Sequence, residues 1–260
     1  MDLLRQISNL VFALTQILAG WLPMLFGVGM GVGEQSAGSQ TAVIPAGYAF
    51  SIWGLIFLLA LIYAIYQLFP SQRQNKLLRQ VGWWTAGAFL FNTIWELVAQ
   101  FVTFGWPTAV IILIIGFFAI GALLKLTASE QELSKTEKWV IWAPVSMLAG
   151  WISAAVFANI SSVLYQLNFN NFGLSATAFA QLLLVIAVVF AGYVLYKAGG
   201  NWLYGLTILW ALVAIAVANI SRTANEAVVA TVAILGVLFV IEMIVLIYPR
   251  AEKNGVVGRV

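Results

Sequence analysis

Residues 107–127 read PTAVIILIIGFFAIGALLKLT, and the only charged residue among them is Lys125, near the end. A run of this kind matches the roughly 20 helical residues that cross a hydrocarbon core about 30 Å thick. None of the long apolar runs alternates strictly between apolar and polar residues, as a lipid-facing barrel strand does. The sequence therefore predicts an all-α, polytopic transmembrane helix bundle. Its eight expected spans cover residues 8–32, 45–69, 80–102, 107–127, 138–165, 175–197, 201–220 and 226–248.

The composition supports this fold class and excludes several kinds of chemistry. Of the 260 residues, 63% are hydrophobic and 8% are charged, whereas a soluble domain carries about 25% charged residues. The chain contains no cysteine and no histidine. This excludes thiolate and Ser-His-Asp catalysis, as well as sulfur and di-histidine metal sites. We therefore expect no enzymatic activity, no metal and no obligatory cofactor.

The positive charges predict an orientation in the membrane. If eight spans are assumed, every Lys and Arg except Arg222 falls on the same side as the N-terminus. Cytoplasmic loops carry the excess of such residues, so both termini are expected in the cytoplasm. The residues behind the net charge of +3 therefore set the orientation of the helices in the membrane, and no nucleic-acid partner is expected. Our default localisation is a bacterial inner (plasma) membrane.

Several polar features on or near the spans have two readings. The Gly/Ser-rich residues 31–44 form either a lid over a binding site or a plain connector. Glu96 and Glu242 lie within predicted spans, where a carboxyl group is either functional or held by structural hydrogen bonds. Arg222 and Glu226 are one helical turn apart, and a local ion pair is the expected role for them.

Three aromatic motifs on the second, third and fifth spans carry a family resemblance. The second span begins Pro45-Ala46-Gly47-Tyr48-Ala49-Phe50-Ser51-Ile52-Trp53, the third contains Asn92-Thr93-Ile94-Trp95, and the fifth has Trp151 followed by Asn159. This pattern resembles the translocator-protein family, also called tryptophan-rich sensory proteins (TspO/MBR). The family usually has Trp where this chain has Tyr48, and Pro-Tyr where this chain has Met147 and Leu148.

The resemblance covers residues 8–168 and implies a particular organisation. Residues 1–170 would form a five-helix bundle of the TspO type, and residues 171–260 would add three transmembrane helices and a short cytoplasmic tail. One short repeat links the two parts, because Ala-Asn-Ile-Ser occurs at both 158–161 and 218–221. An ancient duplication and coincidence both explain it.

By resemblance, the protein binds or senses a flat hydrophobic ligand within the membrane, either tetrapyrrole-like or isoprenoid- and sterol-like. A bound porphyrin or lipid, membrane lipid and a homodimer partner are the associated expectations. The resemblance also leaves one enzymatic activity open, a light-dependent tetrapyrrole chemistry. Two other functions stay open: a proton-coupled secondary transporter of a small amphipathic substrate, and a membrane scaffold or assembly factor. The candidate ligand-binding residues are Tyr48, Phe50, Trp53, Asn92, Trp95, Glu96, Trp151 and Asn159.

Overall fold

The computed structural model describes residues 2–38, 41–102, 105–129, 132–222 and 224–253, and these described residues contain helices but no strand. Short helical segments are α2 (Val32–Ala37), η1 (Gly47–Ser51), η2 (Pro70–Gln72), α6 (Lys135–Glu137), the π-helical η3 (Lys138–Trp142) and η4 (Asn171–Gly173). The long helices are α1 (Asp2–Phe26), α3 (Ile52–Leu68), α4 (Lys76–Val102), α5 (Trp106–Thr127), α7 (Ala143–Gln166), α8 (Ala176–Lys197), α9 (Trp202–Ser221) and α10 (Glu226–Lys253).

The all-α prediction is confirmed. In the described part of the chain, seven helical segments are long and apolar enough to cross a membrane. The remaining long helix, α4, has the length, but polar residues such as Asn92, Glu96 and Gln100 make it less apolar. The eight long helices correspond one to one with the eight expected spans.

The first span differs from its predicted boundaries. We expected a helix over residues 8–32, whereas α1 runs from Asp2 to Phe26. It stops there because Gly27 and Gly29 have φ values of +63° and +77°, in the left-handed region that ends helices and favours glycine. The loop expected over residues 31–44 contains the short helix α2, and its residues 39 and 40 lie outside the described part of the chain.

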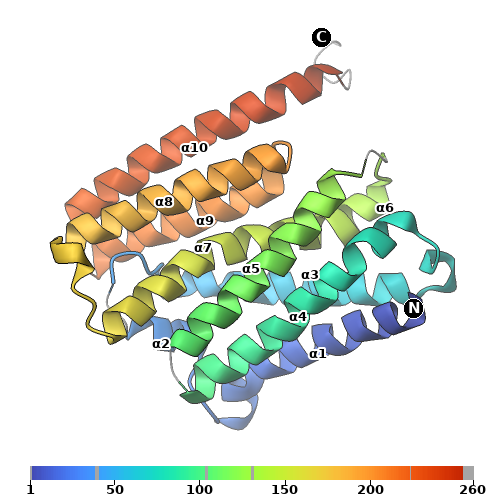
Figure 1. Cartoon of the computed structure of the whole chain (residues 1–260), viewed down its shortest axis with the longest axis horizontal. Helices are drawn as coiled ribbons and strands as arrows, with labels where there is room; N and C mark the ends of the chain where they lie inside the picture. Colours follow the sequence, from blue (N-terminus) through green and yellow to red (C-terminus); the bar gives the residue numbers. More distant parts are fainter. Residues whose placement is uncertain (1, 39–40, 103–104, 130–131, 223, 254–260) are drawn as a thin grey trace.

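Helix α7 lies at the centre of the bundle. It packs against α5, α9, α8 and α3, and α10 is the outermost helix beyond α8 and α9 (Figure 1). In the most apolar stretch of the span that contains α7, 72% is buried inside the protein, whereas the corresponding value for α10 is 17%. Pro144 cannot donate a backbone hydrogen bond, and the turn just before α7 widens into the π-helix η3. Helices α8 and α9 therefore pack on α7, α9 also contacts η1, and α10 packs on α8 and α9. The domain division at residue 170 stays a prediction.

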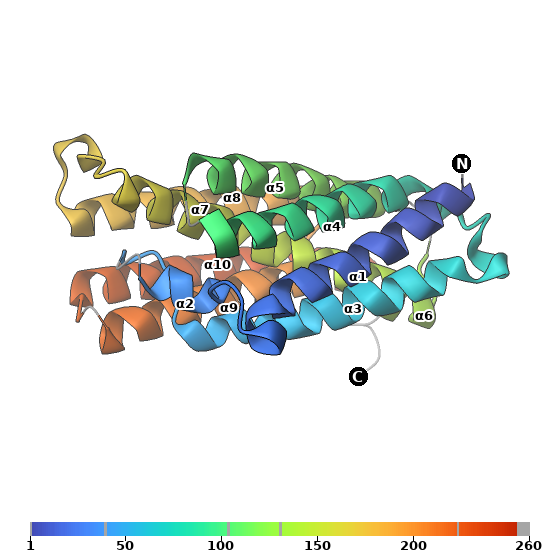
Figure 2. The same ribbon diagram turned by 90° about the horizontal axis from the view of Figure 1, so that it is seen from below.

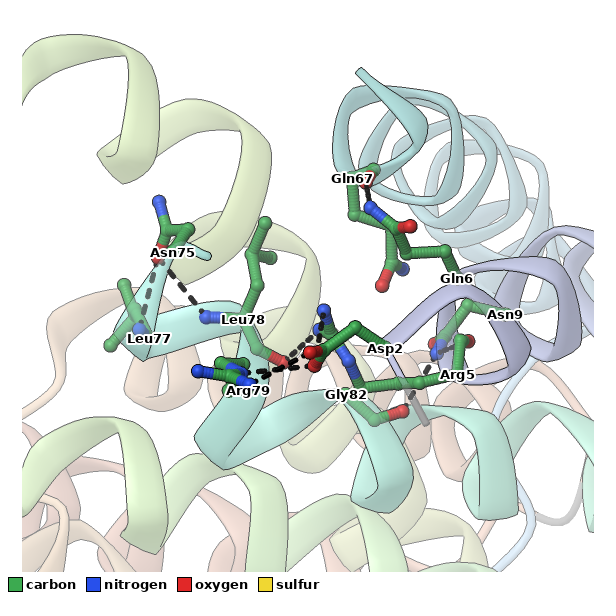
Figure 3. A network of polar contacts seen from close by, with 10 residues as sticks. All are labelled: Asp2, Arg5, Gln6, Asn9, Gln67, Asn75, Leu77, Leu78, Arg79 and Gly82. Carbon is green, nitrogen blue, oxygen red and sulfur yellow. Dashed lines mark hydrogen bonds and ion pairs between the residues drawn. The ribbon is translucent and has the colours of Figure 1, made fainter. Parts of the chain in front are cut away.

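Polar side chains join α1 to α4 near the N-terminus. Arg5 is 1% exposed and donates to the backbone carbonyl of Leu78 (Figure 3). Asn9 donates to the carbonyl of Gly82 at 2.7 Å. A Cβ on Gly82 would lie 2.7 Å from Cδ of Arg5, so glycine permits this approach. Because an unpaired polar group is costly in an apolar interior, these contacts fix the pairing of the two helices.

Candidate functional site

The end of the bundle away from the N-terminus is covered by α2 and by residues 41–46, which we call the roof segment (Figure 2). Val43 and Ile44 of this segment are 2% and 1% exposed, so they face the interior. Pro45 and Ala46 lead into η1, where proline is tolerated because it precedes the first helical hydrogen bonds. The roof segment therefore closes this end with apolar side chains.

Helix α9 and the turn after it hold the roof segment in place. Asn219 donates to the carbonyl of Ala42 at 2.8 Å, and the Ala46 amide donates to the carbonyl of Ala214 at 3.0 Å. Arg222 donates through Nη2 to the carbonyls of Thr41 and Ile44, at 3.3 and 3.1 Å. Partial burial lowers the pKa of Arg222 from its ordinary value, but a guanidinium stays protonated in proteins. Helix α9 and the turn after it thus secure the roof with several hydrogen bonds, two of them from a charged donor.

An apolar cavity of about 40 Å³ lies beneath the roof segment. Its walls come from α2, the roof segment, η1, α4, α5, α7 and α9. The lining residues that bear on function are Phe50, Trp95, Trp151, Asn159, Ala155, Ala211 and Ile215. A cavity of this size has room for a few water molecules at most.

Aromatic rings form one side of this cavity. The ring of Trp151 meets Phe50 at a centroid distance of 5.9 Å and an interplanar angle of 87°. It meets Trp53 at 6.2 Å and 86°, and Trp53 in turn stacks on Phe57 at 5.1 Å. These are the edge-to-face and offset arrangements that aromatic pairs prefer. Rings from η1, α3 and α7 therefore form one continuous aromatic wall, which Trp95 of α4 joins as a cavity-lining residue.

Asn159 lines the cavity together with Ser36 and Ser162, and it is the polar residue of the three whose side chain has no partner there. Its side chain is 4% exposed, and neither its Nδ2 nor its Oδ1 has a hydrogen-bond partner among the described residues. The indole Nε1 of Trp151 is also buried without such a partner. Leaving a buried donor or acceptor unpaired costs about 1–3 kcal/mol. The cavity therefore combines apolar walls with polar groups that a bound molecule can satisfy.

The eight candidate residues do not all lie in this cavity. Phe50, Trp95, Trp151 and Asn159 line it, and Trp53 supports it from behind through Trp151. Tyr48 is 44% exposed and lies edge-on to Trp210 of α9, at a centroid distance of 5.4 Å.

Asn92 and Glu96 face α1 instead of the cavity. Asn92 donates to Oε1 of Gln16 at 3.2 Å, and Glu96 accepts from Gln100 at 3.3 Å. Gln100 also donates to the carbonyl of Ala19 at 2.8 Å. Both candidates thus belong to the polar contact between α1 and α4.

Sequence reasoning missed the contribution of α9. Ala211 and Ile215 line the cavity, yet small and aliphatic residues on a distant helix carry no local signal. Arg222 was expected to pair with Glu226, but no ion pair joins these two described residues, and Arg222 binds roof carbonyls instead. The one available signal was the Ala-Asn-Ile-Ser repeat, because both copies reach the roof segment. From the first copy Ser161 donates to Oγ1 of Thr41, and from the second Asn219 binds Ala42.

Replacing Arg222 with Gln is expected to loosen the roof segment. A hydrogen bond from a charged donor contributes about 1.5–3 kcal/mol, so the amides of residues 41–49 should exchange about tenfold faster. Hydrogen–deuterium exchange followed by mass spectrometry measures this directly. The same substitution at Arg73, which is exposed between α3 and α4, should leave exchange in residues 41–49 unchanged. Unaltered exchange there in the Arg222 variant would mean that the guanidinium does not hold the roof.

Comparison with known proteins places the chain beside one described family. A family model described as "TSPO-like protein" matches residues 4–246. This range extends beyond the motif resemblance over 8–168 and includes α8, α9 and most of α10. No curated protein and no solved structure gives a significant match.

Proposed function

Because the chain belongs to the TSPO-like family and is an integral membrane protein of that type, we propose that it binds a flat apolar ligand in the aromatic cavity. A metal-free tetrapyrrole is the ligand class that we favour, with an isoprenoid- or sterol-like molecule as the second choice. The absence of His and Cys from the sequence removes the usual axial ligands of haem iron. Ring stacking on Phe50, Trp95 and Trp151 is the interaction that would hold such a molecule.

One observation carries this proposal: Asn159 lines a largely apolar, aromatic-walled cavity, and its buried carboxamide has no hydrogen-bond partner among the described residues. Ligand pockets typically combine apolar walls with a few oriented polar groups. A carboxamide both donates and accepts, so it can pair with a ligand carboxylate, carbonyl or ring N–H. The free energy lost by leaving Asn159 unpaired is recovered when such a ligand binds.

The size of the cavity requires the roof to move. Pockets for small molecules usually enclose about 300–1,000 Å³, far more than the 40 Å³ present under the closed roof. Of the cavity walls, α4, α5, α7 and α9 are long packed helices, whereas α2 and the roof segment are short. We therefore assign ligand entry to displacement of the roof segment, against the hydrogen bonds from Arg222 and Asn219.

Titration with protoporphyrin IX tests the proposal. The purified full-length chain in lipid nanodiscs should shift the porphyrin absorbance in a saturable manner with one site per chain. Trp151→Leu should weaken binding about tenfold. The variant loses the stacking of the indole ring on the porphyrin, and an aromatic pair contributes about 0.5–1.5 kcal/mol beyond the buried area. Trp139→Leu is the matched control, since Trp139 is 68% exposed and lies outside the cavity. A linear, non-saturating response would count against the proposal.

Replacing Asn159 with Leu should have opposite effects on stability and on binding. The empty protein gains stability because a buried unpaired amide is replaced by an apolar group of similar size, a change of about 1–3 kcal/mol. The affinity for protoporphyrin falls about tenfold because the ligand loses its polar partner. Thermal unfolding and porphyrin titration measure the two effects. If stability falls while affinity is unchanged, Asn159 has a structural role and not a ligand-binding one.

Proton-coupled transport is the second candidate function, and Glu96 is the observation that favours it. This carboxyl group is 2% exposed on α4, and no ion pair with a cation is found for it in the described part of the chain. Intramembrane acids often mark proton pathways. Proteoliposomes that contain a pH-sensitive dye would show substrate-dependent proton movement, and Glu96→Gln would abolish it.

The placement in the cell is also a proposal. The distribution of Lys and Arg supports a cytoplasmic location for both termini, and the default membrane is the bacterial inner one. In that orientation the roof segment faces the outer side, so a ligand would enter from outside or from the outer leaflet. We propose no catalytic step, and the scaffold and homodimer expectations stay secondary to ligand binding.

A further inference from the structure

A second, separate concavity lies on the flank of the bundle. Helices α5 and α8 both pack on α7 (Figure 1), and the groove between them has a volume of about 790 Å³. Its walls are apolar over most of their length, with Phe117 and Ile120 from α5, Phe157 from α7, and Phe190 from α8. It shares no lining residue with the aromatic cavity. Binding in this groove is therefore independent of binding in the aromatic cavity.

Two lysines mark one end of the groove. Lys125 lies in the last turn of α5 and Lys197 in the last turn of α8, and both residues line the groove. Both side chains are exposed, and neither takes part in an ion pair among the described residues. Tyr193 also lines the groove, and its ring centroid is 5.6 Å from Nζ of Lys197. The groove is thus apolar along its length and cationic at a single end.

We propose that this groove binds an anionic phospholipid from the surrounding membrane. One acyl chain lies along the apolar wall, and the phosphate lies between the ammonium groups of Lys125 and Lys197. Lipid tails are as apolar as the wall, so the wall alone gives little preference for one lipid over another. The two cations supply the preference, because Lys near a membrane surface attracts anionic headgroups. The lysines lie in the same groove as the acyl-chain wall, which is the charge complementarity that selects this occupant.

Native mass spectrometry of the full-length chain tests the proposal. The protein is incubated with phosphatidylglycerol or with phosphatidylcholine of identical acyl chains, and the lipid-bound fractions are compared. The unmodified protein should prefer phosphatidylglycerol about tenfold. The double variant Lys125→Gln/Lys197→Gln should lose this preference. Its matched control, Lys76→Gln/Lys135→Gln, removes two exposed lysines outside the groove and should keep the preference.

A second variant tests the groove without changing charge. Leu113 lines the groove and is 52% exposed, whereas Val110 is 53% exposed and lies outside it. Leu113→Trp should reduce binding of both lipids, and Val110→Trp should not. Equal binding of the two lipids by the unmodified protein, or a preference that survives in the double lysine variant, would overturn the proposal. A stable dimer that Leu113→Trp dissociates would assign the groove to a second copy of the chain and would overturn it as well.

Discussion

Replacing Ala155 with Leu is expected to abolish porphyrin binding while leaving the empty protein at least as stable. Ala155 lies on α7 one turn from both Trp151 and Asn159 and lines the cavity. The added carbon atoms fill most of the 40 Å³ beneath the roof. Because residual cavity volume costs about 24 cal/mol per Å³, filling it should stabilise the protein by up to about 1 kcal/mol. The Leu side chain then occupies the space that the ligand needs beside Trp151 and Asn159, so the affinity for porphyrin should fall at least a hundredfold.

The two effects are measured by thermal unfolding and by porphyrin titration in nanodiscs. Ala230→Leu is the control, because it makes the same substitution at an exposed position of α10. It should change neither quantity. If Ala155→Leu binds porphyrin with the affinity of the unmodified chain, the ligand does not occupy the cavity.

Replacing Gly150 with Ala is expected to destabilise the protein by about 1–3 kcal/mol, the usual result of overpacking. A Cβ at this position of α7 would lie 2.8 Å from Cβ of Thr207 and 2.9 Å from the backbone carbonyl of Tyr204. A backbone atom cannot rotate away, so α9 must shift. Since α9 supplies Ala211 and Ile215 to the cavity, ligand affinity should fall together with stability.

Gly116→Ala provides the matched control for this prediction. A Cβ at Gly116 on α5 would lie 3.7 Å from Val156 and 3.8 Å from Ile152, which is ordinary contact. In a helix, alanine is more favourable than glycine by about 1 kcal/mol, so this variant should be neutral or more stable. Denaturant or thermal unfolding of the two variants side by side should therefore give opposite signs. If Gly150→Ala is as stable as Gly116→Ala, then α7 and α9 do not pack as closely as described.

The fold was largely predictable from the sequence because a bilayer imposes long apolar helices. The ends of those helices were less predictable. A hydropathy pattern does not register that Gly27 and Gly29 adopt left-handed conformations and end α1 six residues before the expected boundary.

The site was predictable only in part. Phe50, Trp95, Trp151 and Asn159 came from motifs and meet at the cavity. Asn92 and Glu96 are one turn apart on α4 and face α1, whereas each residue turns the helix by about 100°, so Trp95 points elsewhere. Helical geometry alone therefore predicts that Trp95 and Glu96 lie on different faces of α4.

The role of Arg222 was not predictable, because it depends on long-range packing. Local spacing favoured its pairing with Glu226. The carbonyls of Thr41 and Ile44 are far away in the sequence and come close only when α9 packs on α7. No local pattern encodes such a contact.

The central claim is that an interior cavity, walled by rings from three parts of the chain and closed by the roof segment, receives a flat apolar molecule. An experimental structure of the protein with protoporphyrin IX bound is the most direct test. We expect the porphyrin to stack against Phe50, Trp95 and Trp151, and we expect residues 41–46 to be displaced outward. Porphyrin in the groove between α5 and α8, or on the lipid-facing surface above an unmoved roof, would contradict it.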